Sequence, residues 1–465
     1  MPQYSVKPWK FLLLTFGCKV NQYESEAIRE AWFNLGGIET SRIEDADLIC
    51  INSCAITSKG ERDCRAAIAQ VRRKNSAAKI ILTGCAAKLY PNLPLNDPNR
   101  PNLILDQKDK ASLLNDPWTM FKASTTDQDL QNCPSNLLKP TLPLHFDSGN
   151  AKLYPPFSIA TYKRARAVLK IQDGCTHRCT YCIVPSLRKN LSSRHPHEII
   201  AEAKRLCLNG FAEIIISGIN LKQYGLDQPE FGNFWSLIAH LERELATNFS
   251  KPPRIRLSSI EPSQLTTQGL EVLAQSKLLC PQLHISLQHA SQRILKRMGR
   301  GHYRPEILVD AMDKIGQSWP RFGLGCDIIV GFPGEEEADY QELFNFCQEL
   351  PFTYAHVFPY SPRPNTPAAL FDGKVEYKTK MERAAKLRKL FAEKNLEFSK
   401  SLLNQKVQLH VIADSTQPKD SHEQKGVAEY YIQCSFHPLK TYDHNIHNAI
   451  PEKITAKGLF VKICD

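Results

Sequence analysis

The sequence lacks any apolar run long enough to cross a membrane, which takes about 20 residues. The apolar segment nearest the N-terminus, residues 11–16, is shorter than the core of a secretory signal and fits a first β-strand better. Long repeats and low-complexity tracts are missing as well. These absences argue against a membrane protein, a repeat protein and a disordered chain. They predict a cytoplasmic protein of two or three globular domains, with no membrane partner.

The chain carries an excess of positive charge, with 59 Lys and Arg against 48 Asp and Glu and a formal net charge of +11. Basic surfaces gain affinity for polyanions because binding releases condensed counterions. The charge therefore favours a nucleic-acid partner, although many soluble proteins are mildly basic and the excess alone decides little.

Cysteine is abundant, with 15 residues in the chain. Disulfide scaffolds suit short secreted chains that cannot build a core, whereas 42% of this long chain is hydrophobic. Metal or cluster ligation in a reducing compartment explains the cysteines better, with the remainder serving as small buried hydrophobes.

Residues 1–130 alternate apolar strands with helices, which predicts a small α/β domain with a parallel sheet. Its strands are expected over residues 10–16, 47–52 and 79–83, and its helices from about Ser25 to Gly36 and over residues 60–73. Residues 131–155 are rich in Pro, Asn and Asp and are predicted to be a linker.

Residues 156–400 show regular strand–helix alternation, which predicts an open (β/α)6 partial barrel with its site at the carboxyl ends of the strands. The expected strands cover residues 167–172, 213–217, 254–258, 283–288, 323–330 and 353–358. The expected helices cover residues 197–208, 234–246, 264–274, 292–298, 305–316 and 336–350.

A long basic helix is expected next, over residues 377–403, and residues 401–465 then change to short strands, expected over residues 407–412, 428–436 and 458–464. These strands predict a small all-β module of barrel or OB-like type. The basic residues of the helix are Lys378, Lys380, Arg383, Lys386, Arg388, Lys389 and Lys394. They could hold an RNA backbone, or form an ordinary solvated helix face.

The strongest local signal is the C-x3-C-x2-C motif of Cys175, Cys179 and Cys182, directly after the first barrel strand. A [4Fe–4S] cluster needs four ligands, and this loop supplies only three thiolates. The fourth iron would be open to another ligand, as in reactive metal centres. The alternative is a zinc site with His177 as fourth ligand, but a second C-x2-C element is missing.

This spacing resembles the radical-SAM superfamily, in which the open iron binds S-adenosylmethionine (SAM). The resemblance implies that Cys175, Cys179 and Cys182 are the catalytic cluster ligands. It also implies SAM contacts at the carboxyl ends of the strands, from Tyr181, Ser217, Gly218, Asn220, Ser286, Gln288, Asp327 and Gly331.

Three further cysteines, Cys18, Cys54 and Cys85, each follow a predicted strand of the first domain. The carboxyl ends of parallel strands converge on one crevice, so these thiolates could hold a second cluster. The alternative is that all three are buried core cysteines. Cys50 and Cys64 do fit that alternative, since they lie within a strand and on the core face of a helix.

The combination of both cysteine sets with a C-terminal β-module resembles the methylthiotransferase family, whose last module is a TRAM domain. The sequence from Gly17 to Ser25, Gly-Cys-Lys-Val-Asn-Gln-Tyr-Glu-Ser, is similar to the branch that acts on N6-threonylcarbamoyladenosine in transfer RNA. The chain departs from the family pattern where Lys189 follows Arg188, where Ala290 follows Leu287-Gln288-His289, and where Asn365 replaces a usual glycine.

The resemblance implies an enzyme that methylthiolates C2 of that adenosine beside the anticodon. The cluster on Cys175, Cys179 and Cys182 would generate a deoxyadenosyl radical from SAM. The second [4Fe–4S] cluster, on Cys18, Cys54 and Cys85, would carry the sulfur. The expected partners are the anticodon stem-loop of tRNA, a reductant such as flavodoxin or ferredoxin, and a sulfur donor.

Two alternatives stay open at this point. A sibling methylthiotransferase would act on isopentenyladenosine or on a ribosomal protein. A non-catalytic iron–sulfur protein would bind RNA or transfer electrons, and electron transfer favours closed clusters with four cysteines each.

We expect the anaerobically purified protein to hold two [4Fe–4S] clusters, or about eight irons per chain. Iron and sulfide analysis with Mössbauer spectroscopy would measure this. A single cluster in protein whose Cys18, Cys54 and Cys85 are reduced and intact would rule out the sulfur-donor role of the first domain.

Overall fold

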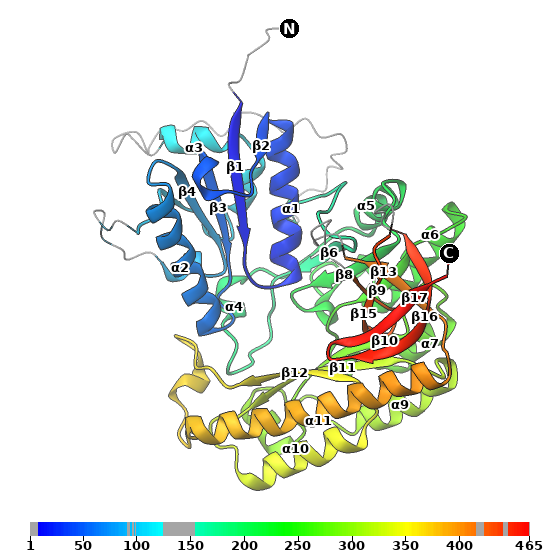
Figure 1. The fold of residues 1–465 in the computed structure, drawn as a ribbon. Coiled ribbons are helices and arrows are strands. Elements are labelled where there is room, and N and C mark those ends of the chain that lie inside the picture. Colours follow the sequence, from blue (N-terminus) through cyan, green and yellow to red (C-terminus); the bar gives the residue numbers. More distant parts are fainter. Residues whose placement is uncertain are drawn as a thin grey trace. The chain divides into compact units, whose positions relative to one another are not determined.

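The structure is a computed structural model that describes residues 8–90, 94, 97, 99–123, 154–414, 423–439 and 445–464. It comprises two compact units (Figure 1). The first is Met1–Ile159 with Ser186–Arg188, and the second is Ala160–Pro185 with Lys189–Asp465. Most of the linker predicted over residues 131–155 lies outside the described residues. None of the helices in the described ranges has the length and apolar character needed to span a membrane.

The first unit contains a parallel five-stranded sheet in the order β2-β1-β3-β4-β5, which confirms the predicted architecture. The strands are β1 (Trp9–Thr15), β2 (Gly37–Glu39), β3 (Leu48–Ser53), β4 (Lys79–Gly84) and β5 (Leu103–Ile104). β2 and β5 were not predicted, because strands of three and two residues are too short to show a pattern.

The first helix begins earlier than predicted. α1 spans Lys19–Asn34, whereas the sequence indicated a start near Ser25. Asn21 and Glu24 make its first turns look polar, yet both are buried. The Asn21 amide donates to the carbonyl oxygen of Ser53 at 2.8 Å, and such long-range partners are invisible in the sequence. Cys18 therefore occupies the N-cap of the helix.

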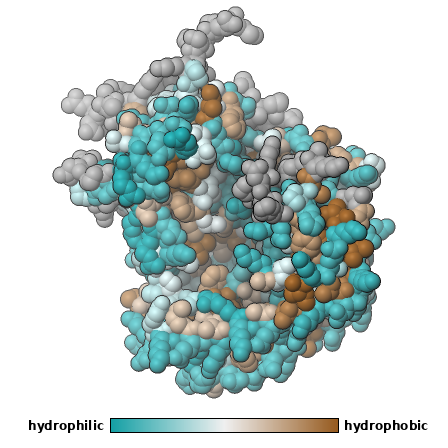
Figure 2. All heavy atoms as spheres, viewed as in Figure 1, coloured by the Kyte–Doolittle hydropathy of each residue, from teal (hydrophilic) through white to brown (hydrophobic). Residues whose placement is uncertain are grey.

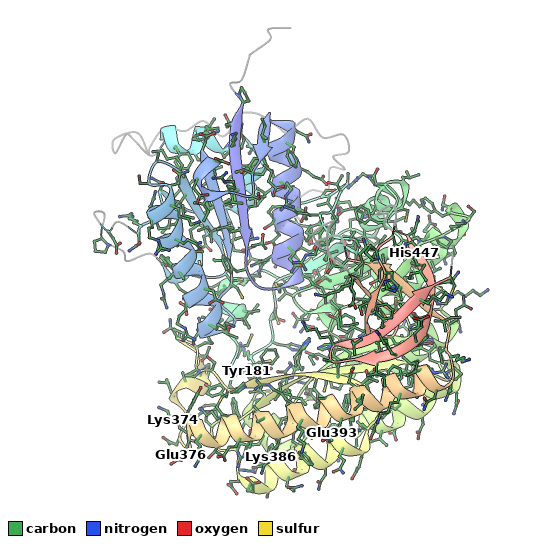
Figure 3. The ribbon with its side chains drawn as sticks, viewed as in Figure 1. Tyr181, Lys374, Glu376, Lys386, Glu393 and His447 are labelled. Atoms are coloured by element: carbon green, nitrogen blue, oxygen red, sulfur yellow. The ribbon has the colours of Figure 1, made fainter. Side chains whose placement is uncertain are left out.

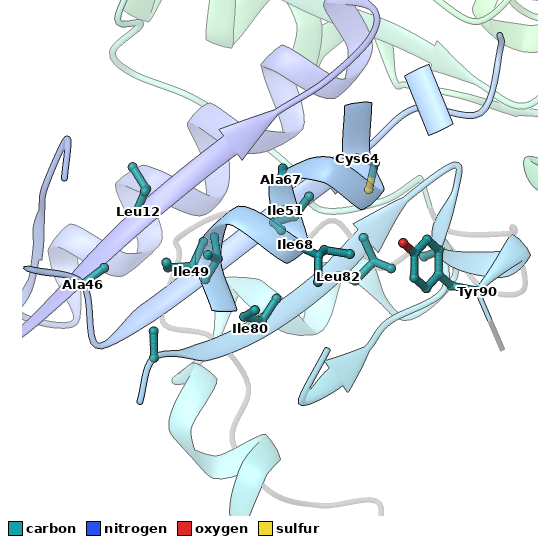
Figure 4. Packing of buried hydrophobic residues seen from close by; sticks show 13 residues of the cluster. Leu12, Ala46, Ile49, Ile51, Cys64, Ala67, Ile68, Ile80, Leu82 and Tyr90 are labelled. Atoms are coloured by element: carbon teal, nitrogen blue, oxygen red, sulfur yellow. The ribbon is translucent and has the colours of Figure 1, made fainter. Parts of the chain in front are cut away.

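The core of this unit lies between the sheet and α2 (Ser58–Lys74), as Figure 4 shows. Ile49 and Ile51 of β3 and Leu82 of β4 are fully buried there against Ile68 of α2. Burying each such side chain stabilises the fold by about 1.5–3 kcal/mol. A short α3 (Pro117–Ala123) follows the sheet.

The second unit contains the six parallel strands that the sequence predicted. β6 (Ala167–Asp173), β8 (Glu213–Gly218) and β9 (Arg254–Leu257) form one sheet, and β10 (Gln282–Gln288), β11 (Gly323–Val330) and β12 (Tyr354–Pro359) form another. Single bridges from Ile255 to Leu279 and from Ile260 to Ile285 link the two sheets. A two-residue strand, β7 (Ser192–Ser193), pairs antiparallel with β6 and was not predicted.

The expected helices of the barrel are all present, with small shifts in their ends. They are α5 (Pro196–Leu208), α6 (Phe234–Asn248), α7 (Thr267–Gln275), α8 (Gln292–Arg297), α9 (Ile307–Ser318) and α10 (Glu337–Glu349). A four-residue α4 (Val184–Leu187) follows the cysteine loop. β12 pairs only with β11 among the described strands, so the barrel is open.

The long helix α11 spans Tyr377–Asn404, and hydrophilic side chains predominate over it in Figure 2. Much of its positive charge already has partners within the chain. Arg383 is buried and pairs with Glu335 at 2.7 Å. Lys394 donates to the carbonyl oxygen of Gln348 at 2.7 Å. Lys386 is exposed, and Figure 3 labels it together with Glu393 along the helix.

The C-terminal module is a closed barrel in the order β13-β14-β15-β17-β16. Its strands are β13 (Leu409–Ala413), β14 (Gln424–Val427), β15 (Gln433–Phe436), β16 (Ile446–Thr455) and β17 (Gly458–Ile463). One predicted strand is partly wrong, because residues 428–431 form a turn, with Tyr431 at φ 65°. α11 continues to Asn404, and the first strand of the module begins at Leu409.

A buried ion network explains that turn. Arg256 donates to both Glu213 (2.7 Å) and the carbonyl oxygen of Glu429 (2.9 Å). Arg254 donates to Glu213 at 2.6 Å and to the carbonyl oxygen of His410 at 2.6 Å. Burial would raise the pKa of Glu213, but Arg256, Arg254 and Arg166 outweigh it and hold this pKa well below its usual range. The network ties the C-terminal module to the partial barrel.

We expect Arg256→Met to lower the free energy of unfolding by about 3 kcal/mol, because it leaves the buried Glu213 with less compensating charge. The substitution should also weaken the attachment of the C-terminal module to the partial barrel. Chemical denaturation and limited proteolysis of the full chain would measure both effects. Arg243→Met, at an exposed position of α6, is the matched control and should change neither. Equal behaviour of the two variants would contradict the role assigned to the network.

Candidate active site

The loop that carries Cys175, Cys179 and Cys182 leaves the end of β6 through a turn fixed by buried polar groups. Gly174 has φ 75°, and a Cβ there would lie 2.0 Å from the carbonyl oxygen of Asn190, so only glycine fits. The Asp173 carboxylate accepts from the backbone N–H of Gly174 at 2.7 Å. The first thiol is thereby placed directly beyond the carboxyl end of the strand.

The thiols of this loop have different surroundings. Burial would raise the pKa of Cys179, but hydrogen bonding with His177 and the charge of Arg300 outweigh it and lower this pKa. The Arg300 guanidinium lies 3.6 Å from the Cys179 Sγ. Burial raises the pKa of Cys182 to about 12, and it also raises that of Cys175. A bound metal would stabilise the thiolate form of all three.

His177, the alternative fourth ligand, contacts a carboxylate. Its Nδ1 lies 3.0 Å from Glu261 Oε1, and hydrogen bonds with Cys179 and Glu261 raise the pKa of His177 to about 9. The same carboxylate contacts His302 at 3.2 Å and Arg300 at 3.4 Å. With His177 held in this way, the three thiolates suit a cluster with one open iron.

Two of the predicted SAM contacts lie close to the cysteine loop. The Asn220 amide is 3.8 Å from Cys175 Sγ. The carbonyl oxygen of Ser286 accepts from Arg300 at 3.3 Å, and Arg300 also contacts the loop. Tyr181, labelled in Figure 3, belongs to the loop itself and packs edge-on against Phe332, with ring centroids 6.4 Å apart.

The other predicted contacts occupy the ends of their strands. Ser217 and Gly218 close β8, and Gln288 closes β10 with φ 65°. Gly331 follows β11 at φ 69°. Asp327 lies three residues before the end of β11 and pairs with His284 and His356. The roles of all these residues in binding SAM stay predictions.

Several residues at this site were missed by sequence reasoning. Gln172 accepts from the backbone N–H groups of Ile219 (3.0 Å) and Asn220 (2.9 Å), and so joins the ends of β6 and β8. Glu261 and Arg300 were missed because they lie in loops after β9 and α8. The sequence offered one signal for these two residues. Each follows directly after a predicted strand or helix, in the loops where the site of a parallel barrel is expected.

In the first unit, Cys18, Cys54 and Cys85 meet at the carboxyl edge of the sheet. A Cβ on Gly17 would lie 2.8 Å from the Cys54 Sγ, so the chain just before Cys18 passes close to Cys54. The backbone N–H of Cys85 donates to the carbonyl oxygen of Ser53 at 3.0 Å. Burial raises the pKa of Cys18, while Arg188 opposes that rise and Cys85 adds to it.

Cys50 and Cys64 are core cysteines, as predicted. Both are buried, with exposed fractions of 1% and 0%. Burial raises the pKa of each to about 12. Cys50 lies within β3 and Cys64 within α2, whereas the three cysteines of the set lie beyond the ends of strands.

A buried ion network adjoins the three cysteines. Lys110 contacts Glu24 and donates to the Asn52 amide oxygen at 2.8 Å. Arg188 donates to the same Glu24 at 2.9 Å and to the Asn21 amide oxygen at 3.2 Å. The described groups thus place two cations on one carboxylate. Thiolate-ligated [4Fe–4S] clusters are anionic, so the residues present fit such a group.

Arg188, the residue just before the departure at Lys189, contributes to the first cysteine set. Arg188 lies six residues after Cys182, yet it belongs to the first unit and is buried, with 4% of its surface exposed. Its charge lowers the pKa of the Cys18 thiol against the effect of burial. The chain therefore places a residue of the second motif beside the first cysteine set.

The three-cysteine loop at the carboxyl end of the first strand of an open parallel barrel defines a radical-SAM iron–sulfur enzyme. Comparison with known families agrees, since the radical SAM superfamily matches residues 169–347. The family described as uncharacterized protein family UPF0004 matches residues 10–105.

Similar proteins extend over nearly the whole chain. It is 33% identical over 423 residues to the threonylcarbamoyladenosine tRNA methylthiotransferase MtaB of Bacillus subtilis, covering 91% of this chain and 89% of that protein. The Thermotoga maritima protein of the same name is 33% identical over 430 residues, with 91% and 90% covered. The tRNA-2-methylthio-N(6)-dimethylallyladenosine synthase of Thermus thermophilus is 30% identical over 389 residues, with 83% and 77% covered.

Among solved structures, the radical SAM methyltransferase TsrM of Kitasatospora setae, bound to tryptophan and a SAM analogue, matches with a TM-score of 0.54. The match covers 78% of this chain and 75% of that chain at 14% identity, so it concerns the fold alone. The chain belongs to the radical-SAM methylthiotransferase family. Its cofactors are accordingly SAM and [4Fe–4S] clusters, as the sequence predicted.

If Cys18, Cys54 and Cys85 hold a [4Fe–4S] cluster, we expect Lys110→Met to lower the reduction potential of that cluster. Losing a buried cation destabilises the more negative, reduced cluster by on the order of 1–2 kcal/mol, or about 40–90 mV. A redox titration followed by electron paramagnetic resonance (EPR) would measure the shift. Lys79→Met, exposed on β4, is the control. An unchanged potential in Lys110→Met protein with full cluster content would contradict the electrostatic role.

Proposed function

We propose that this enzyme transfers a methylthio group to C2 of N6-threonylcarbamoyladenosine, beside the anticodon of tRNA. The observation that carries the proposal is the 33% identity over 91% of the chain to two proteins named for that activity. The sequence from Gly17 to Ser25 supports the same branch.

The two cysteine sets would divide the work. Cys175, Cys179 and Cys182 would hold the cluster that binds SAM, and Cys18, Cys54 and Cys85 would hold the cluster that carries sulfur. When bound, these groups supply the radical that activates C2 and the methylthio group that replaces its hydrogen. Acid–base chemistry could not do so, because that carbon has neither a leaving group nor an acidic proton.

The protein's own part is to fix the reacting groups. The turn at Gly174 and the contact from Arg300 hold the three-cysteine loop at one end of the barrel. Asn220 and Ser286 are near that loop and are candidates to orient SAM. Tyr181 offers an aromatic face beside the adenine. Holding SAM and the cluster in a fixed geometry makes a reaction between separate molecules effectively a reaction within one complex.

The tRNA would reach this site with its target base unstacked, which a loop nucleotide allows at low cost. The net charge of +11 supports binding to its backbone. Lys386 and the neighbouring exposed Lys378 and Lys389 of α11 are candidate contacts. A reductant such as flavodoxin or ferredoxin and a sulfur donor complete the proposed set of partners.

The nearer alternative is the sibling activity on dimethylallyladenosine, supported by 30% identity over 83% of the chain to the Thermus thermophilus enzyme. The two substrates differ at the N6 substituent, which bears a carboxylate in one and is apolar in the other. Nucleoside analysis separates them directly.

We expect the wild-type gene to restore the methylthio form of threonylcarbamoyladenosine in a strain that lacks this activity, measured by mass spectrometry of tRNA nucleosides. Cys182→Ser should abolish it, because the cluster loses one of its three loop ligands. Cys207→Ser, on α5 and outside both cysteine sets, is the matched control and should retain it. Restoration of methylthio-dimethylallyladenosine in the corresponding deletion strain would instead establish the sibling activity.

A further inference from the structure

Three adjacent strands of the barrel bring a carboxylate and two imidazoles together. Asp327 of β11 pairs in register with His356 of β12, and His284 of β10 pairs with Gly325, two residues before Asp327. Since residues two apart on a strand share a face, all three side chains lie on one face of this sheet.

The distances within this group match those between ligands of a single ion. His284 Nε2 and His356 Nδ1 each lie 3.1 Å from Asp327 Oδ1, and the ligand atoms all lie within 4.8 Å of one another. Ligands about 2.0–2.2 Å from a metal ion, at angles between octahedral and tetrahedral, are about 2.9–3.4 Å apart. The group therefore has the spacing that a metal site requires.

A hydrogen bond with Tyr354 holds the His284 ring in the orientation that a metal ligand needs. Its Nδ1 lies 3.1 Å from the Tyr354 hydroxyl, which also accepts from the Gln282 amide at 2.8 Å. The Tyr354 ring packs on Tyr431 with centroids 5.0 Å apart. A second partner on the far ring nitrogen is typical of histidines that bind metals, because it leaves the near nitrogen to face the ion.

The side chains are graded in exposure, with 9% for His284, 23% for Asp327 and 51% for His356. His284 is thus buried and held by its neighbours, whereas His356 is accessible to solvent.

A second group of this kind, His177 with Glu261 and His302, carries no separate inference. Its members contact Arg300 and the cysteine loop, so it belongs to the site already described. The contacts of Asp327 with His284 and His356 do not involve the cysteine loop.

We propose that His284, Asp327 and His356 bind one divalent transition-metal ion, separate from both clusters. Two imidazoles and one carboxylate suit Zn²⁺, Fe²⁺ or Mn²⁺ better than Mg²⁺, which prefers oxygen ligands. Three protein ligands leave further positions for water or for a substrate group. The inference goes beyond the proposed function and does not depend on which base is modified.

The test uses the holoenzyme, with both cysteine sets filled by clusters so that thiolates do not compete for the added metal. Mn²⁺ is titrated anaerobically and free Mn²⁺ is measured by EPR, in which oxidised [4Fe–4S] clusters give no signal. We expect one Mn²⁺ bound per chain, released on addition of one equivalent of Zn²⁺.

The variants locate the site. His356→Ala and Asp327→Asn should weaken Mn²⁺ binding more than about tenfold. His356 is half-exposed on β12, the last strand of the partial barrel, so replacing it should leave the fold and the iron content intact. His240→Ala, a surface histidine 3.9 Å from Glu244, is the matched control and should bind as the wild type does.

Two results would overturn the proposal. One is a wild-type holoenzyme that binds no stoichiometric Mn²⁺ or Zn²⁺, which would make the group a hydrogen-bonded structural triad. The other is binding that persists unchanged in both His356→Ala and Asp327→Asn. Neither result would bear on the tRNA nucleoside assay, so failure here and failure of the proposed function can be told apart.

Discussion

Parallel strands end at a common edge, and this constraint brings together every reactive group of the protein. In the first unit it joins Cys18, Cys54 and Cys85, which are far apart in the sequence. In the second unit it places the three-cysteine loop beside residues that follow β8, β9 and β10. The chemistry of the family depends on this geometry, because a cluster needs several thiolates at one point while one iron stays open.

Buried charge then fixes the loops that the sheets leave free. Glu24 is held by Lys110 and Arg188, and Glu213 by Arg254 and Arg256. A buried carboxylate is tolerated only where cations and hydrogen bonds compensate it, so each network permits few arrangements of the segments around it. One network adjoins Cys18, and the other attaches the C-terminal module to the barrel.

The barrel interior also has a polar layer that the cysteine chemistry does not require. A carboxylate between two imidazoles is costly to place inside a sheet unless hydrogen bonds or an ion satisfy it. Tyr354 connects this layer with Tyr431 in a turn of the C-terminal module. The packing of that module therefore bears on the geometry of the His284 side chain.

The sequence by itself determined most of the longer strands and helices, the fold class and the family, because these depend on local periodicity and spacing. It missed β2, β5 and β7 because they are too short to show a period, and β14 and β16 of the C-terminal barrel as well. It misplaced the start of α1, where buried Asn21 and Glu24 imitate a polar loop.

Only the tertiary structure decided which charged residues matter. Arg188, Lys110 and Arg300 look like surface residues in the sequence, but their partners Glu24 and Cys179 lie 86 to 164 positions away. Much of the basic helix, conversely, proved to be paired within the chain. Pairing between distant charges is set by packing in three dimensions, for which local sequence carries no signal.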